Sequence, residues 1–338
     1  MRTSGQLRRE DEIFSARKIL GLKLLELPGE RVLLVLRDGE RWTECAALQE
    51  RGGRWSELKR LHGPGQARAL DAQVVEGDVW LAWELNGYWP IEVSRCRIRE
   101  LLDPKQSPLA LQPVGHAALS GEQALRAVLP VAHHWHVAGP LSPNEWLFSP
   151  RFVPGDAPGT MIVNTSDGQA MLISPRGLQE ESTRFALPHA GTPQASTDAS
   201  SGRMVAFLSR EEGLDAPFWT LRRYHGRSGP HSGALMVVEN GKPENLSESL
   251  GLGPVSGFQL LQERGESWLF TLRDSAAGTK VSALQRDVSG WRVRGTLDIH
   301  KAVQMLDVTH DRQRGWLLFL VVEAQEKSSI VCRSWMIP

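Results

Sequence analysis

The chain has 338 residues, of which 41% are hydrophobic and 23% charged, and its formal net charge at neutral pH is zero. This composition supports a sizeable folded core, whereas the balanced charge argues against nucleic acid or an anionic membrane as partner, because both call for a basic surface. The N-terminal residues are charged where a signal peptide needs an apolar run, and no stretch reaches the ~20 apolar residues of a membrane span. We therefore expect a cytoplasmic protein.

The use of cysteine and of basic residues also favours a cytoplasmic protein. The three cysteines, Cys45, Cys96 and Cys332, are odd in number and far apart, which favours neither a disulfide framework nor a metal site. Of the 39 basic residues, 31 are Arg, a bias typical of a GC-rich genome and hence of a bacterial source. We expect a reducing compartment, no cofactor and no resident metal.

A 27-residue segment occurs twice without a gap, at residues 29–55 and again at residues 265–291. Eleven aligned positions are identical, including Gly-Glu at the start, Leu-Arg-Asp and Ala-Leu-Gln inside, and the closing Trp. A match of this length is typical of a repeat architecture. Each copy consists of short apolar runs bounded by Gly, Asp and Ser, which is the pattern of consecutive β-strands.

The apolar run inside this segment recurs along the chain and predicts the fold. Such runs, 48 to 66 residues apart, begin at Val32, Trp80, Trp146, Val205, Trp268 and Trp316. A four-stranded sheet cannot bury both of its faces alone, so six such sheets are expected to stack face against face as blades. We predict an all-β fold, a single six-bladed β-propeller domain over residues 1–338, with the Trp residues packed between blades.

The blades follow one another in chain order, and the last one lacks a strand. We predict blades at residues 20–62, 70–113, 132–188, 194–250, 255–298 and 303–338. A missing outer strand in the sixth blade would leave an unpaired edge, which propellers avoid. Residues 11–18 (DEIFSARK) have no other assignment, so we predict that this N-terminal strand completes the sixth blade and closes the ring.

The fourth blade has turn residues that resemble a known repeat. Residues 196–209 (STDASSGRMVAFLS) place an Asp-containing turn and a Gly before an apolar strand, and residues 233–248 end in strand–Gly–Lys–Pro–x–x–Leu–Ser. Asp accepts backbone N–H bonds in such turns, and Gly adopts positive φ. Both stretches resemble TolB-type propeller repeats. The chain as a whole resembles TolB-like and WD40-like β-propeller repeat proteins and, more distantly, sialidase-like six-bladed propellers, without identifying one family.

Histidines near the start of the third predicted blade are the first candidates for chemistry. In AHHWHV, His134 and His136 share one face of a strand, and such a pair can chelate a metal. A metal site needs a third ligand, and the segment offers no nearby carboxylate or thiol. The alternative, which we favour, is that these histidines are hydrogen-bonded within a strand or line the central channel.

A basic insertion in the fourth predicted blade is the best candidate for a binding site. It spans about residues 210–232, and its recognition residues are predicted to be Trp219, Arg222, Arg223, Tyr224, His225, Arg227 and His231. A basic segment with aromatic residues can recognise phosphate or an acidic partner, and loops on a rigid scaffold often carry function. The alternative is a solvated loop that balances acidic residues elsewhere.

Enzymatic alternatives lack their motifs. A sialidase-like site would need an Arg triad, a Tyr–Glu pair and an Asp acid, but the chain has only two tyrosines and no intact Asp-box. A carboxylate pair that includes Glu84 stays open, because such pairs come from distant segments. The G-x-S-x-G, GxxxxGK[ST], GxGxxG, HExxH and CxxC motifs do not occur.

The sequence thus favours a non-catalytic role over an enzyme. We predict a scaffold or adaptor subunit that presents loops to a protein partner within a larger assembly. The alternative is a glycan-active enzyme or lectin of sialidase-like propeller type. Converging Arg and carboxylate side chains at one mouth of the channel would favour that alternative.

Overall fold

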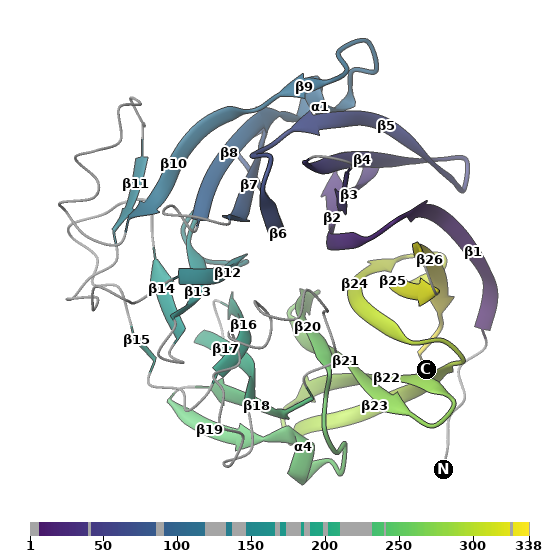
Figure 1. Cartoon of the computed structure of the whole chain (residues 1–338). Coiled ribbons are helices and arrows are strands. Elements are labelled where there is room, and N and C mark those ends of the chain that lie inside the picture. Colours follow the sequence, from purple (N-terminus) through teal and green to yellow (C-terminus); the bar gives the residue numbers. More distant parts are fainter. Residues whose placement is uncertain are drawn as a thin grey trace. The chain divides into compact units, whose positions relative to one another are not determined.

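The computed structural model describes residues 7–39, 42–85, 91–118, 133–136, 147–165, 170–173, 184–185, 190–198, 202–209, 232–239, 241–324 and 327–337. The described strands form six separate sheets (Figure 1). The chain divides into two compact units, one of residues 18–188 and one of residues 1–17 and 189–338, and each contains three of the sheets. In the described part of the chain, no helix is long and apolar enough to cross a membrane.

The unit of residues 18–188 contains the first three sheets. The first has β2 (Ile19–Leu27), β3 (Glu30–Asp38), β4 (Thr43–Arg51), β5 (Arg54–His62) and β9 (Leu109–Ala110). The second has β6 (Ala67–Val75), β7 (Asp78–Leu85), β8 (Ile91–Arg97), β10 (Gln112–Ala118) and β11 (His133–His136). The third has β12 (Leu147–Phe152), β13 (Met161–Thr165), β14 (Ala170–Ile173) and β15 (Arg184–Phe185). Helix α1 (Ile98–Leu102) lies between β8 and β9 in the chain.

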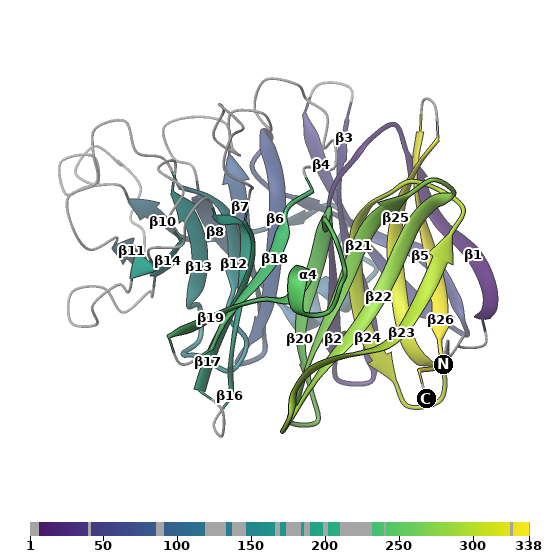
Figure 2. The same ribbon diagram turned by 90° about the horizontal axis from the view of Figure 1, so that it is seen from below.

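The other unit contains the last three sheets, drawn from green to yellow in Figure 2 apart from one purple strand of the sixth sheet. The fourth has β16 (Ala190–Asp198), β17 (Gly202–Ser209), β18 (Ala234–Glu239) and β19 (Lys242–Asn245), which leads into helix α4 (Leu246–Ser249). The fifth has β20 (Gly257–Glu263), β21 (Glu266–Ser275), β22 (Gly278–Asp287) and β23 (Gly290–Ile299). The sixth has β24 (Val303–Asp311), β25 (Gly315–Ala324), β26 (Lys327–Trp335) and β1 (Leu7–Ala16).

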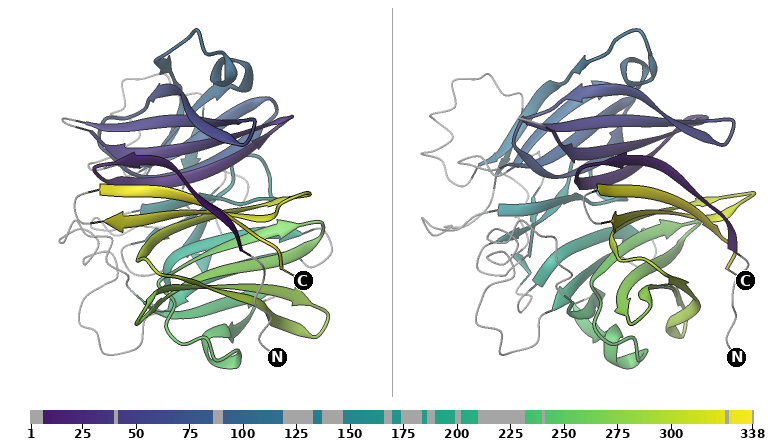
Figure 3. Two further views of the ribbon diagram at one scale, coloured as in Figure 1. Left: turned by 90° about the vertical axis from the view of Figure 1, so that its right-hand side faces the viewer. Right: turned by 45° about the vertical axis from the view of Figure 1, so that its right-hand side comes forward.

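The N-terminal strand belongs to the sixth sheet, as predicted. β1 pairs antiparallel with β26, from Leu7 opposite Trp335 to Ala16 opposite Ser328. Figure 3 shows β1, in dark purple, running along the yellow strands of that sheet. The sheet therefore has four strands, and β26 does not end it with an open edge.

Six successive sheets of meandering antiparallel strands are the blades of a six-bladed β-propeller, which confirms the predicted fold class. Blades one and two are larger than predicted. β9 pairs in parallel with β5 as the fifth strand of blade one, and β11 pairs in parallel with β10 as the fifth strand of blade two. The sequence assigned residues 132–188 to the third blade, whereas the structure pairs β11 with β10 in the second. Strand pairing places β11 there, a feature that the hydrophobic pattern of AHHWHV does not specify.

Apolar packing between neighbouring blades holds each unit together. Four buried clusters join blades one and two, two and three, four and five, and five and six. The second strands supply continuous apolar runs, and every residue from Trp316 to Val322 in β25 is buried. Trp268 and Trp316 come from adjacent blades, and their ring centroids lie 4.9 Å apart. The prediction that these Trp residues pack between blades is confirmed, at roughly 1.5–3 kcal/mol per large buried side chain.

The duplicated blades share one register. In both blades the third and fourth strands pair at aligned positions, and both ladders are interrupted between the aligned Ala-Leu residues, at Ala47/Leu48 in blade one and Ala283/Leu284 in blade five. This interruption is a β-bulge, which increases the local twist of the outer strand. The shared Gly has a φ of 77° at Gly29 and 79° at Gly265, a conformation that side chains with a Cβ rarely adopt.

Cys45 and Cys96 are buried in the cluster between blades one and two. Burial raises the pKa of the Cys96 thiol to about 12 and also raises the pKa of Cys45. Both thiols stay protonated at pH 8, so we expect iodoacetamide to modify them at least ~1,000-fold more slowly in the native protein than in urea. Mass spectrometry of the alkylated peptides measures both rates, with the half-buried Cys332 as internal reference. Rapid native labelling of Cys45 or Cys96 would contradict this packing.

Candidate functional site

The basic insertion lies outside the described residues, so the structure does not place its predicted recognition residues, Trp219, Arg222, Arg223, Tyr224, His225, Arg227 and His231. The backbone of His134 and His136 is described, on β11. The register of β11 against β10 sets His134 opposite His116, a third histidine that the sequence reading missed. In the part of the chain that the structure describes, no group of three His, Cys, Asp or Glu side chains is arranged to hold a metal ion.

A recurring polar position on the innermost strands is the clearest polar feature of the described residues. In five of the six blades, the fourth residue before the end of the innermost strand is polar. These residues are Lys23, Asp71, Gln194, Gln259 and Asp307. The innermost strand has no ladder partner on its inner edge, so side chains or water can bond the backbone groups there. We call these five residues the inner polar belt.

Asp71 receives bonds from the blades on both sides of it. Its carboxylate is 2% exposed, and its Oδ1 lies 2.8 Å from Nζ of Lys23 in blade one and 3.8 Å from Nη1 of Arg151 in blade three. The backbone N–H of Phe152 donates to Oδ2 over 2.7 Å. A buried carboxylate is tolerated when it is paired and hydrogen-bonded in this way.

Two further acceptors of blade two bind the backbone of blade three. The N–H of Ser149 donates to Oε2 of Glu84 over 2.9 Å, and the N–H of Gly159 donates to Oε1 of Gln73 over 3.4 Å. Ser149 is buried, lies at a β-bulge and has a φ of 53°, which is strained for a residue other than glycine. Glu84, the candidate for a catalytic pair, therefore holds a strained bulge of the next blade.

The same belt ties blades four, five and six. The side-chain amide of Gln194 donates to the carbonyl of Phe258 and accepts from the N–H of Leu260, both over 2.8 Å. Gln259 donates to Oδ1 of Asp307 over 2.6 Å, and the N–H of Val308 donates to the same oxygen over 2.9 Å. The bonds of Gln194 and Gln259 join the innermost strands of adjacent blades, and the bond to Val308 holds the backbone next to Asp307. The inner polar belt therefore sets how neighbouring blades are aligned.

The belt is therefore better suited to holding blades than to acid–base chemistry. Among the described residues, Asp71 and Asp307 are the buried carboxylates, and each accepts bonds from the neighbouring blade. A general acid or base must have a proton position open to substrate. Arg151 and Lys23 converge on Asp71, but the carboxylate between them is enclosed.

The residues repeated between blades one and five have structural partners. Gln49 donates to Glu30 over 2.8 Å, and the aligned Gln285 donates to Glu266 over 2.5 Å. The repeated Arg37 binds across the hairpin to the residue opposite it, with Nη2 2.9 Å from Oε2 of Glu44.

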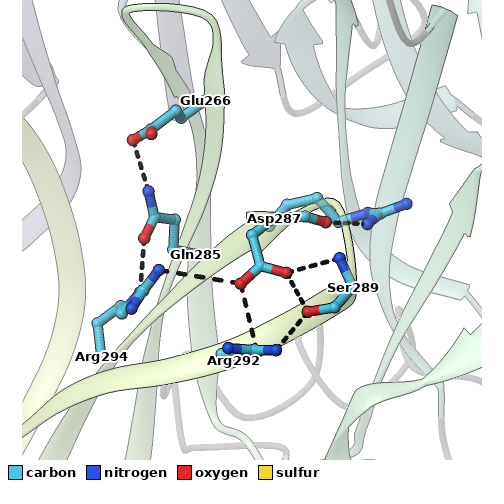
Figure 4. A network of polar contacts seen from close by, with 7 residues as sticks. Glu266, Gln285, Asp287, Ser289, Arg292 and Arg294 are labelled. Carbon is cyan, nitrogen blue, oxygen red and sulfur yellow. Dashed lines mark hydrogen bonds and ion pairs between the residues drawn. The ribbon is translucent and has the colours of Figure 1, made fainter.

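Blade five adds a charged network at its outer hairpin (Figure 4). Asp287 lies 3.2 Å from Nε of Arg292 and 3.9 Å from Nη2 of Arg294, and it accepts bonds from the side chain and backbone of Ser289. Hydrogen bonding from Ser289, with a smaller effect of the two arginines, lowers the pKa of Asp287. Arg294 also donates to Gln285 over 2.6 Å. Glu266, which accepts from Gln285, and Glu239, which lies 2.8 Å from Arg286, balance the arginines of this region.

Comparisons with known proteins support the fold and leave the family open. Neither a protein-family model nor a curated protein sequence matches the chain. Among solved structures, the WD40 domain of Toxoplasma gondii coronin matches with a TM-score of 0.57 and 11% identity, over 99% of this chain and 86% of that one. Weaker matches include BBS1N in complex with ARL6DN (TM-score 0.48, 12% identity, 100% and 98% covered) and Cellvibrio cellulosa alpha-L-arabinanase (0.47, 13%, 84% and 96%). At these identities the similarity concerns the fold alone.

Proposed function

We propose that this propeller is a non-catalytic scaffold or adaptor that presents its surface to a protein partner in a larger assembly. The inner polar belt carries this proposal, because its buried carboxylates, Asp71 and Asp307, are occupied in joining blades. Blades held together in this way within each unit suit recognition by surface loops.

The basic insertion is proposed as one contact site of this scaffold. Its Arg222, Arg223 and Arg227 can form charge-assisted bonds with an acidic partner, and Trp219 and Tyr224 can anchor the contact. Replacing the three arginines together with alanine is expected to weaken partner binding by at least about tenfold, the effect of ~1.4 kcal/mol. Co-purification of the partner with wild type and variant measures this, and unchanged recovery would dismiss the insertion as a contact site.

A glycan assay separates the scaffold from the enzymatic alternative. We expect no sugar release from arabinan, from xylan or from aryl glycosides, including aryl sialosides. The variants Asp71→Asn and Asp307→Asn, which keep the shape of the side chain, serve as controls for contaminating activity. Turnover by the wild type that disappears in a variant with an unchanged melting temperature would overturn the proposal, because that carboxylate would then act on substrate.

We also propose that the protein is cytoplasmic and of bacterial source. No disulfide joins Cys45, Cys96 and Cys332, which suits a reducing compartment such as the bacterial cytoplasm. We propose no cofactor, nucleic acid or membrane partner, because the net charge is zero and no cofactor motif occurs.

A further inference from the structure

The outer edges of the two duplicated blades differ in what covers them. In blade one, β9 pairs in parallel with the outer strand β5, with Leu61 opposite Leu109 and His62 opposite Ala110. In blade five, the outer strand β23 has β22 as its one neighbour among the described strands (Figure 2). Ten residues of β23 thus end the described sheet with an edge whose outward backbone groups have no strand partner.

The covered and uncovered edges are equivalent residue for residue. In blade one Leu61 lies opposite Cys45, and in blade five Leu297 lies opposite Val281, the residue aligned with Cys45. Both leucines are 5% exposed. In blade one the pairing with β9 begins beyond the β-bulge, where the outer strand is regular again. The same regular stretch in blade five contains Leu297 and the exposed Asp298. This stretch of β23 therefore has the same register as the stretch of β5 that pairs with β9.

The blades differ where the covering segment enters. Lys59 on β5 is buried and donates through Nζ to the carbonyls of Glu100 and Asp103, which fixes the end of helix α1 against blade one. Its aligned residue is Gly295, whose Cα faces the ring of Trp335. Trp335 of blade six thus occupies the position at blade five that α1 takes at blade one. A segment that binds the edge of β23 would therefore not need a helix like α1 before its strand.

The charged side chains along the edge of β23 indicate which kind of segment it would bind. Arg292 and Arg294 share the single carboxylate of Asp287, and their side chains are 59% and 37% exposed (Figure 4). Towards the other end of β23, Lys280 and Asp298 lie 3.6 Å apart and balance each other. The beginning of the edge therefore presents two partly exposed guanidinium groups beside one carboxylate. A parallel segment would bring its own N-terminal side to these arginines.

We propose that the outer edge of β23 binds an extended segment of a partner protein by parallel strand addition, with an apolar side chain opposite Leu297 and acidic residues preceding it near Arg292. This proposal rests on the proposed scaffold function and names its partner's chemistry. Main-chain bonds along the edge supply affinity, and the acidic residues supply orientation.

Two synthetic peptides test the edge on the full chain. The acidic probe is acetyl-EETVTLAL-amide, and the control is acetyl-KKTVTLAL-amide, which keeps the strand and apolar residues. We expect the acidic probe to bind about tenfold tighter by fluorescence anisotropy. Hydrogen exchange of residues 294–299 should slow when the probe is bound. Arg292→Glu should reverse the preference, while Ser56→Glu, at the aligned position of the covered blade one, should leave it unchanged.

The remaining outcomes overturn the proposal. No binding of either peptide, or protection confined to other strands, would show that this edge does not add a strand. Protection of residues 294–299 in the free protein that grows with protein concentration would identify a second copy as the occupant. Protection independent of concentration would identify another segment of this chain. Partner cross-links that map elsewhere on the chain would refute this edge and leave the scaffold function standing, whereas glycan turnover would refute the function itself.

Discussion

Replacement of Asp71 by alanine is expected to lower the free energy of unfolding by about 3–5 kcal/mol, the cost of removing one partner from a buried ion pair. The substitution leaves the N–H of Phe152 without its acceptor and leaves Lys23 and Arg151 facing each other without the carboxylate between them. The midpoint and slope of urea denaturation, followed by tryptophan fluorescence, measure the change.

Matched substitutions separate the effect of breaking the inner polar belt from the effect of losing any carboxylate. Asp78 also pairs with an arginine, Arg95, at 3.2 Å, but that pair is solvent-exposed, so Asp78→Ala is expected to cost less than about 1 kcal/mol. The double variant Lys23→Met/Asp71→Leu should recover part of the stability, because it removes Lys23 together with its partner and leaves only the 34% exposed Arg151 without that carboxylate. Equal effects of Asp71→Ala and Asp78→Ala would mean that the belt does not hold the blades.

Deletion of residues 1–16 is expected to be at least as damaging, because it removes the outer strand of blade six. β1 pairs with β26 from Leu7 to Ala16, and its loss exposes the edge of β26 and the apolar residues beneath. We expect a loss of more than about 3 kcal/mol and a melting temperature lower by roughly 6–12 °C or more. Differential scanning calorimetry measures the temperature, and light scattering detects association through the exposed edge.

A shorter truncation serves as the control for this deletion. Removing residues 1–6 leaves β1 complete and is expected to keep the melting temperature of the full chain. Addition of a synthetic peptide of residues 7–17 to the longer truncation should restore part of the stability by re-forming the pair with β26. A chain without residues 1–16 that melts at the full-length temperature would contradict the role of β1.

The sequence was sufficient to predict the fold because repetition makes strand order visible. The gap-free match of residues 29–55 to 265–291 corresponds to two blades with one register, and the short sixth blade pointed to residues 11–18 as its missing strand. Additional strands were missed. β9 and β11 pair in parallel with segments distant in the chain, and no local hydrophobic pattern records such a partner.

The candidate site was less predictable, for a physical reason. Lys23, Asp71 and Gln259 differ in charge and size, so no shared motif marks the inner polar belt. Their common feature is a position four residues before a strand end, which could have been found by aligning the innermost strands. The edge of β23 is a backbone feature, visible only once β9 is seen on the aligned strand β5. The basic insertion, which the sequence favoured, remains a prediction.

Affinity purification of the tagged full chain from its native host, with quantitative mass spectrometry and cross-linking, tests the scaffold function most directly. We predict that a protein partner is recovered in stoichiometric amount, is cross-linked to the propeller, and is depleted when Arg222, Arg223 and Arg227 are replaced together or when Arg292 is replaced by Glu. Recovery of the chain alone under mild conditions, together with sugar release from any glycan that requires Asp71 or Asp307, would contradict it.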